Sequence, residues 1–457
     1  MRSSLKKTIY PNRTSQVGVL SALSSPGKPG GGSVAASRSA LPLAFGLGLG
    51  IAAVCLGVAG SAASQPEGAL LARARALHKA SPLVDGHNDY PWAVREKVQL
   101  DLDRLDITTP QPSIMTDIPR LRAGGVGGQF WSVYVPVELA GQSAVTATLE
   151  QIDLVHQMMR KYSDDFELAL TADNIERVFK KGKIASLIGM EGGHSIDSSL
   201  GALRMFHRLG ARYMTLTHSR NVAWADSATD QPKITGLSRF GEQVVREMNR
   251  LGMLVDLSHV SPDTMEDAIR VSDAPVIFSH SSARAVNDVP RNVPDAILRM
   301  LPKNGGVVMV TFVPGFLSAE VAAWERSRDA EQDRLRRQLP GDEGSVRAGI
   351  AAWVKVNPAP RATISDAADH IDHIRRVAGI AHIGIGGDFD GISSVPLGLE
   401  DVSAYPALTA ELLRRGYSDL DVKRINGLNI LRVMREAERV ARTLQQTRKA
   451  SPVSLAK

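Results

Sequence analysis

The sequence predicts an α/β fold, a TIM-type (β/α)8 barrel with a helical insertion after the seventh strand. Short apolar runs alternate with amphipathic stretches over most of the chain, which is typical of repeated βα units and a parallel sheet. Histidines and carboxylates follow the ends of most of these runs, and barrels carry their functional groups at that end of the strands. The 457 residues are enough for one large barrel with insertions.

Eight short apolar runs are predicted as the strands. They are 82–86, 128–135, 184–190, 212–217, 253–258, 275–279, 306–312 and 382–386. Helical spacing predicts helices at about 69–79, 143–162, 173–181, 198–209, 238–251, 262–272, 294–303, 365–378, 404–415 and 419–440. A doubly wound open sheet is the alternative. Against it, no G-x-G-x-x-G follows the first strand, and the sequence has no P-loop.

Two segments depart from the regular alternation. Residues 101–122 form a polar connection after the first strand, and residues 318–360 form a larger insertion after the seventh. The first half of this insertion is charged and helical, and its second half opens with a turn at Leu339. Either a solvated surface helix or a lid or dimer contact near the active-site face fits this pattern, because barrel loops carry function.

Residues 1–63 are predicted to be an export signal or an N-terminal membrane anchor. A basic opening precedes an apolar run, 41–60, and small residues follow it. The run, about 20 residues, could span a bilayer, but its five glycines favour a cleaved signal. We therefore expect an exported protein, periplasmic or anchored facing the periplasm. Residues 64–445 would form the barrel, and residues 446–457 a polar tail.

The charge distribution excludes a nucleic-acid binder. The whole chain carries a formal charge of +6, but six of its 54 basic residues and none of its acidic residues lie in 1–63. The remainder therefore has 48 basic and 48 acidic residues, with no basic patch interleaved with aromatics. The only cysteine is Cys55, so residues 64–457 can form no disulfide.

The residues at the predicted strand ends are of metal-ligand type. They are His87 and Asp89 after the first strand, Glu191 after the third, His218 after the fourth, His259 after the fifth, His280 after the sixth and Asp388 after the eighth. In a barrel these positions converge on one face. Because four of the 11 histidines and three carboxylates share this placement, we predict a shared metal site.

This residue set fits two metal ions better than one. His87 and Asp89 would hold one ion, His259 and His280 the other, and Glu191 could bridge both. Imidazole and carboxylate ligands suit a divalent metal such as zinc. Two ions roughly 3.5–4 Å apart can share a hydroxide and polarise a carbonyl, so such a site is suited to catalysing hydrolysis.

Seven motifs, in order, resemble the membrane (renal-type) dipeptidases, a family of zinc metallopeptidases. They are Asp85–Asp89, Glu191–His194, Leu216–Asn221, Asp256–Ser261, Phe278–Ala283, Arg291–Asp295 and Gly386–Gly391. The resemblance implies two zinc ions per chain and a metal-bridging water that attacks the peptide bond of a dipeptide. It also implies that His218 contacts the scissile carbonyl, Arg291 grips the substrate carboxylate and Asp388 handles the proton.

Local sequence bears on two of these roles. Gly386 and Gly387 precede Asp388, and we expect them to let the backbone turn sharply there. Arg291 lies 11 residues after His280, so it should overhang the metal face, although a surface arginine at a helix start is the alternative.

The chain also departs from the animal members of this family. It lacks their cysteines, which excludes a covalent dimer of the mature body and leaves a non-covalent homodimer, and its C-terminal end is polar. The rival enzyme is another binuclear barrel amidohydrolase, phosphotriesterase- or dihydroorotase-like, acting on a non-peptide amide or ester. Those typically bridge their metals with a carboxylated lysine, where this chain has Glu191. A binding protein that has lost catalysis is a further alternative.

Overall fold

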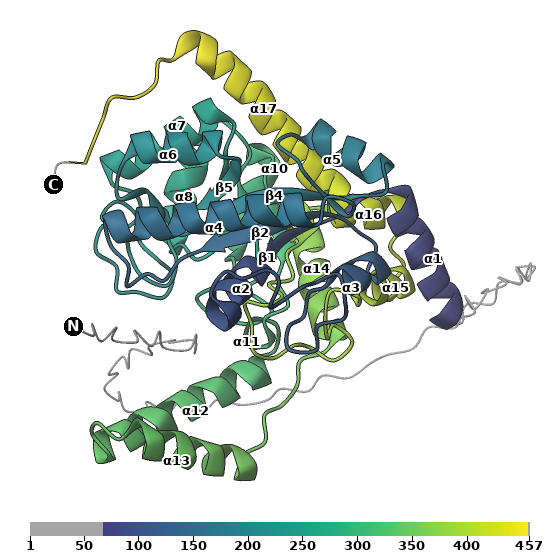
Figure 1. Cartoon of the computed structure of the whole chain (residues 1–457), viewed down its shortest axis with the longest axis vertical. Coiled ribbons are helices and arrows are strands. Elements are labelled where there is room, and N and C mark those ends of the chain that lie inside the picture. Colours follow the sequence, from purple (N-terminus) through teal and green to yellow (C-terminus); the bar gives the residue numbers. More distant parts are fainter. Residues whose placement is uncertain (1–66, 456–457) are drawn as a thin grey trace, which may run out of the picture.

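The computed structural model describes residues 67–455, so the predicted leader and Cys55 lie outside the described residues. Eight parallel strands form a closed barrel, which confirms the predicted fold. Helices pack around the strands (Figure 1). The barrel strands are β1 (Leu83–Asn88), β2 (Val126–Tyr134), β4 (Ile184–Glu191), β5 (Ala211–Thr215), β6 (Leu254–Asp256), β7 (Ile277–Phe278), β8 (Val307–Val310) and β9 (Ile383–Ile385).

The pairing of β2 with β4 closes the barrel. The sheet runs from β2 through β1, β9, β8, β7, β6 and β5 to β4, and residues 128–134 of β2 then pair with residues 185–191 of β4. A ninth strand, β3 (Phe166–Leu168), was not predicted. It pairs with the start of β4, while β5 pairs with its end, so β3 lies outside the barrel wall.

Apart from three that were not predicted, at residues 90–98, 118–123 and 314–317, the helices follow the predicted order. They are α1 (Glu67–Ala80), α2 (Tyr90–Val98), α3 (Ile118–Ala123), α4 (Gln142–Lys161), α5 (Ala172–Lys180), α6 (Leu200–Arg208), α7 (Arg239–Leu251), α8 (Pro262–Val271), α9 (Asp295–Leu298), α10 (Leu301–Asn304), α11 (Pro314–Leu317), α14 (Ile364–Val377), α15 (Tyr405–Arg414), α16 (Asp419–Lys423) and α17 (Asn429–Thr447). The helix predicted at 294–303 is two short helices. A π-helical turn, η3 (Arg424–Leu428), joins α16 to α17. Among these described helices, none is long and apolar enough to cross a bilayer.

The insertion after β8 is a helical hairpin. It consists of α12 (Ala319–Gln338) and α13 (Glu343–Val356), which project from the barrel at the bottom of Figure 1. Trp324 and Trp353 pack together with ring centroids 5.8 Å apart, and Trp324 Nε1 donates to Asn357 O at 2.8 Å. The charged first helix is confirmed, whereas the second half of the insertion forms a second helix beyond the expected turn.

Candidate active site

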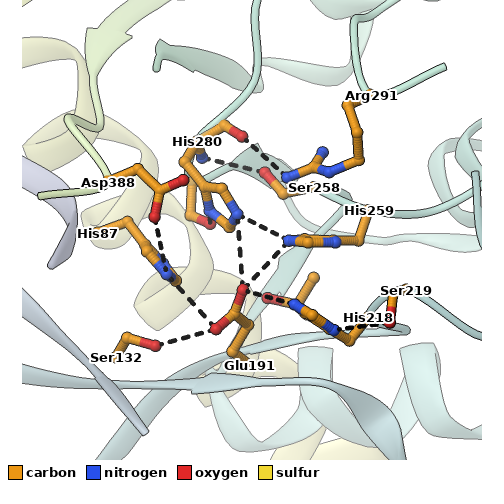
Figure 2. A network of polar contacts seen from close by, with 12 residues as sticks. His87, Ser132, Glu191, His218, Ser219, Ser258, His259, His280, Arg291 and Asp388 are labelled. Atoms are coloured by element: carbon orange, nitrogen blue, oxygen red, sulfur yellow. Dashed lines mark hydrogen bonds and ion pairs between the residues drawn. The ribbon is translucent and has the colours of Figure 1, made fainter. Parts of the chain in front are cut away.

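The barrel brings the predicted ligands together at the carboxyl ends of its strands (Figure 2). His87 is on β1, Glu191 ends β4, and the other members lie one to three residues beyond their strands. His87 Nε2 lies 3.4 Å from Asp89 Oδ2, and His259 Nε2 lies 2.9 Å from His280 Nε2. All these groups are at least nine-tenths buried, so the barrel holds several ionisable side chains with little access to water.

Glu191 stands between the two predicted ligand sets. Its Oε2 is 3.6 Å from His87 Nε2, on the side of Asp89. Its Oε1 is 3.1 Å from His259 Nε2 and 3.8 Å from His280 Nε2. Each oxygen therefore faces a different set, which is the geometry required of a carboxylate that bridges two metal ions.

His218 and Asp388 lie at opposite edges of this centre. His218 Nε2 is 3.4 Å from Glu191 Oε1, and its ring packs against Tyr134 and His259 with centroids 5.0 and 4.3 Å away. Asp388 Oδ1 is 4.0 Å from His87 Nε2. Both residues are close enough to belong to the groups that could hold a metal, so their placement fits contact with substrate or with an ion.

The hydrogen bonds of His87 leave its Nε2 suited to a metal. The Tyr213 hydroxyl donates to Gly86 O at 3.1 Å, so at 2.8 Å it accepts from His87 Nδ1. In the neutral ring the proton is then on Nδ1, and Nε2 carries the lone pair. Nε2 is buried and has no hydrogen-bond partner among the described residues, which would be costly unless a cation binds there.

The electrostatics of the histidines also fit a cationic centre. Burial lowers the pKa of His259 and of His280 well below the usual value, and Arg291 adds to both shifts. Both rings are therefore neutral, the form that binds metals. Burial also lowers the pKa of His87. This effect is outweighed by Tyr213, Glu191 and Asp89, which together raise that pKa well above the usual value. The carboxylates thus favour a positive charge at His87, which a divalent cation would supply.

The backbone is strained at two predicted site residues. His259 and Asp388 have left-handed φ angles of 70° and 62°, which non-glycine residues adopt at a cost of order 1–3 kcal/mol. Neither Gly386 nor Gly387 has a positive φ, and the left-handed conformation belongs to Asp388 itself. Gly386 is needed for close approach: a Cβ there would lie 1.8 Å from Ser279 O.

Arg291 reaches the site from the loop after β7. It is 5% exposed, so it is not the surface arginine of the alternative interpretation. Its Nη2 lies 3.5 Å from His280 O, and its guanidinium carbon is 5.3 Å from the centroid of the Phe316 ring. The side chain is thus fixed beside a predicted metal ligand.

Several contributing residues were missed from the sequence. Ser132 on β2 donates to Glu191 Oε2 at 3.2 Å, Tyr213 bonds His87, and Tyr134 packs on His218. None is of the usual ligand type, and Tyr213 lies within a strand and not at its end. A glycine within a strand often marks the close approach of another group, so Gly189 was a usable signal in the sequence. The group that approaches is the Tyr213 ring, which would lie 2.1 Å from a Cβ at Gly189.

Comparisons with known proteins show what this chain is similar to. Residues 71–448 match the model of the family described as membrane dipeptidase (peptidase family M19). Dipeptidase verJ of Clonostachys rogersoniana is 42% identical over 388 residues, which cover 82% of this chain and 89% of that relative.

Two solved structures share the fold. The probable dipeptidase PvdM from Pseudomonas aeruginosa has a TM-score of 0.71 and 25% identity, covering 82% of this chain and 99% of that one. A metallo peptidase from Rhodobacter sphaeroides, liganded with a phosphinate mimic of the dipeptide L-Ala-D-Ala, has a TM-score of 0.65 and 25% identity. That match covers 78% of this chain and 99% of the other.

Proposed function

This chain belongs to the membrane dipeptidase family, and on that premise we propose that it hydrolyses dipeptides at a centre of two zinc ions. The observation that carries the proposal is the position of Glu191, whose two oxygens face different sets of ligands. The rival barrel hydrolases typically place a carboxylated lysine at this point, and the chain has a glutamate there.

We assign the ligands as the geometry groups them. His87, Asp89 and Glu191 would hold one ion, and Glu191, His259 and His280 the other. The donors are imidazole nitrogens and carboxylate oxygens, which suit zinc. When bound, such a pair of cations lowers the pKa of a shared water and polarises the substrate carbonyl.

The surrounding side chains supply the remaining steps. Asp388 would accept the proton of the attacking water and deliver it to the leaving amine. His218 would donate a hydrogen bond to the oxyanion that develops on the carbonyl. Arg291 would hold the free carboxylate of the substrate through two parallel hydrogen bonds, and this would fix the scissile bond one residue away.

The experiment that tests the function uses purified protein of measured metal content. We expect hydrolysis of a panel of L,L- and L,D-dipeptides, loss of activity on chelation and recovery with zinc. The ligand of the Rhodobacter sphaeroides neighbour supports including L-Ala-D-Ala in the panel. Faster turnover of non-peptide amides or esters than of any dipeptide would favour the rival amidohydrolase function.

We further propose that residues 1–63 direct export, which rests on the basic opening, the apolar run and the small residues after it. Fractionation of cells that express the full chain, with N-terminal sequencing of the product, tests this proposal. A product beginning near residue 64 in the periplasm indicates a cleaved signal, and an intact N-terminus in the membrane fraction indicates an anchor. Intact protein in the cytoplasmic fraction would contradict export.

A further inference from the structure

We infer that two buried aspartates, Asp85 and Asp256, are positioning residues, each of which aligns the ligands of one half of the metal centre. The inference rests on the proposed two-metal function and deepens it. Neither residue is among the proposed ligands. Asp85 precedes His87 by two residues and Asp256 precedes His259 by three, so each lies on a strand just beneath the ligands that it serves.

Asp256 ties together the ends of three strands. Its Oδ1 accepts from the backbone N–H of Ser258 at 3.1 Å and of Ser279 at 2.8 Å. Its Oδ2 accepts from the hydroxyls of Ser279 at 2.7 Å and of Thr215 at 2.5 Å. These partners come from β5 and from the segments that lead to His259 and His280.

The Ser279 hydroxyl passes this constraint to His280. Because its proton is donated to Asp256, its oxygen must accept from His280 Nδ1, 2.8 Å away. His280 therefore carries its proton on Nδ1 and presents the lone pair of Nε2 towards Glu191 and His259. A carboxylate that fixes the tautomer of a metal-binding histidine raises metal affinity, and its loss commonly costs about 10–100-fold.

Asp85 fixes the backbone in the other half of the centre. Its Oδ1 accepts from the backbone N–H of His87 and from Gln129 Nε2, both at 2.8 Å. Its Oδ2 accepts from the backbone N–H of Gly387 at 2.8 Å and from the Tyr405 hydroxyl at 2.6 Å. Asp85 thereby fixes β1 at His87 relative to the segment that leads to Asp388.

Both environments are specific for a carboxylate. Each aspartate is fully buried and receives four hydrogen bonds, two on each oxygen, and every partner is a donor. An asparagine would place its NH2 group where these partners now donate, and only the hydroxyls among them can reverse and accept. In Asp256→Asn this group would donate to Ser279, whose hydroxyl would then donate to His280 Nδ1. The proton of His280 would move to Nε2 and block the metal.

The test counts metal equivalents in a zinc buffer just sufficient to saturate the parent chain. We expect two equivalents in the parent and one in Asp256→Asn. The double variant Asp256→Asn with His280→Ala should still bind one metal ion. The double variant Asp256→Asn with His87→Ala should bind none. Thr215→Val removes one hydroxyl from Asp256 but keeps the link through Ser279, so this control should keep both ions.

Asp85→Asn should give the reciprocal pattern. This variant should retain one equivalent of metal. Adding His280→Ala should remove that ion, whereas adding His87→Ala should not. Tyr405→Phe deletes one of the four hydrogen-bond donors to Asp85 and is the matched control, which should keep both ions. Circular dichroism checks that each variant folds. If Asp256→Asn does not fold, Ser279→Ala replaces it and should lose the same single ion.

Two outcomes overturn the inference while the proposed function stands. In the first, a folded Asp256→Asn or Asp85→Asn variant keeps both metal ions. In the second, either folded variant loses both ions together. A parent chain that binds no metal would instead contradict the proposed function itself.

Discussion

At the scale of the residue, the site depends on groups whose roles differ although they lie within a few ångströms of one another. Asp388 Oδ1 is 4.0 Å from His87 Nε2, close to the ligands but at the edge of the centre, and its backbone φ is 62°. Strain of this kind persists where the surroundings fix a residue for function. Because of its position at the edge of the centre, we propose that Asp388 serves proton transfer more than metal affinity.

Asp388→Asn should keep its metal and lose on the order of 100-fold or more in kcat, the usual scale for a positioned acid or base. The amide keeps the shape of the side chain but cannot accept the proton. Metal analysis and steady-state kinetics on one preparation separate the two effects. Near-normal turnover, or loss of an ion before loss of rate, would show that the assignment is wrong.

Arg291→Ala should abolish the preference for a free C-terminal carboxylate. The parent should hydrolyse a dipeptide much faster than its C-terminal amide, because two parallel hydrogen bonds to the guanidinium require both carboxylate oxygens. The variant should lose most of this preference and keep its metals. Arg299→Ala is the control, since that side chain is 66% exposed and pairs with Asp295. Equal rates for acid and amide in the parent would exclude this role.

The sequence was most informative for residues of ligand type. Their side chains are chemically distinctive, and the barrel brings strand ends together whatever their spacing along the chain. Tyr213 and Tyr405 act through contacts that join residues 126 and 320 positions apart, so no local pattern marks them. The positive φ at Asp388 could not be predicted either, because non-glycine residues rarely adopt it.

At the scale of the element, apolar runs bounded by turns predicted all eight barrel strands. β3 was missed because it has three residues, of which only Phe166 is buried, so it carries little hydrophobic signal. The second helix of the insertion was also missed. α13 packs on α12 and buries only Val346 fully, so it lacks the apolar stripe of a helix that faces a core.

Shortening the hairpin should leave the barrel intact. Replacing residues 327–350 by a short Gly/Ser turn keeps Trp324, Trp353 and Asn357, which join the two helices at their base. Only Leu335 and Val346 are buried within the removed part. We expect unchanged metal content and unchanged kcat for a small dipeptide, measured beside the parent. Loss of activity with metal retained would indicate that the hairpin acts as a lid over the active site. Loss of a dimer that the parent forms would indicate that the hairpin is a dimer contact.

At the scale of the whole molecule, buried histidines make stability depend on pH. His78 joins α1 to Gly124 and Thr409, and burial lowers its pKa from 6.5 to about 4 despite the opposing hydrogen bond to Gly124. Between these values the unfolded chain binds a proton that the folded chain does not. The stabilisation is therefore complete above pH 6.5 and is lost as the pH falls towards 4.

His78→Gln should flatten this dependence. Glutamine offers a donor and an acceptor but does not titrate, so the variant should lose less stability than the parent between pH 6.5 and 4. The difference should be on the order of 3 kcal/mol, from the shift of a single group. Denaturant unfolding of both proteins at several pH values measures it. Parallel pH profiles for the two proteins would mean that His78 does not titrate in this range.

We propose that Glu191 joins two metal ions into one hydrolytic centre. The most direct measurement is dipeptide hydrolysis followed while zinc is added to metal-free protein, in the parent and in Glu191→Gln. The parent should reach full activity at two equivalents. The glutamine variant, which offers one oxygen in place of two, should bind fewer ions and stay far less active at any zinc concentration. Full activity of the parent at one equivalent, or a fully active Glu191→Gln, would contradict the bridging role of Glu191.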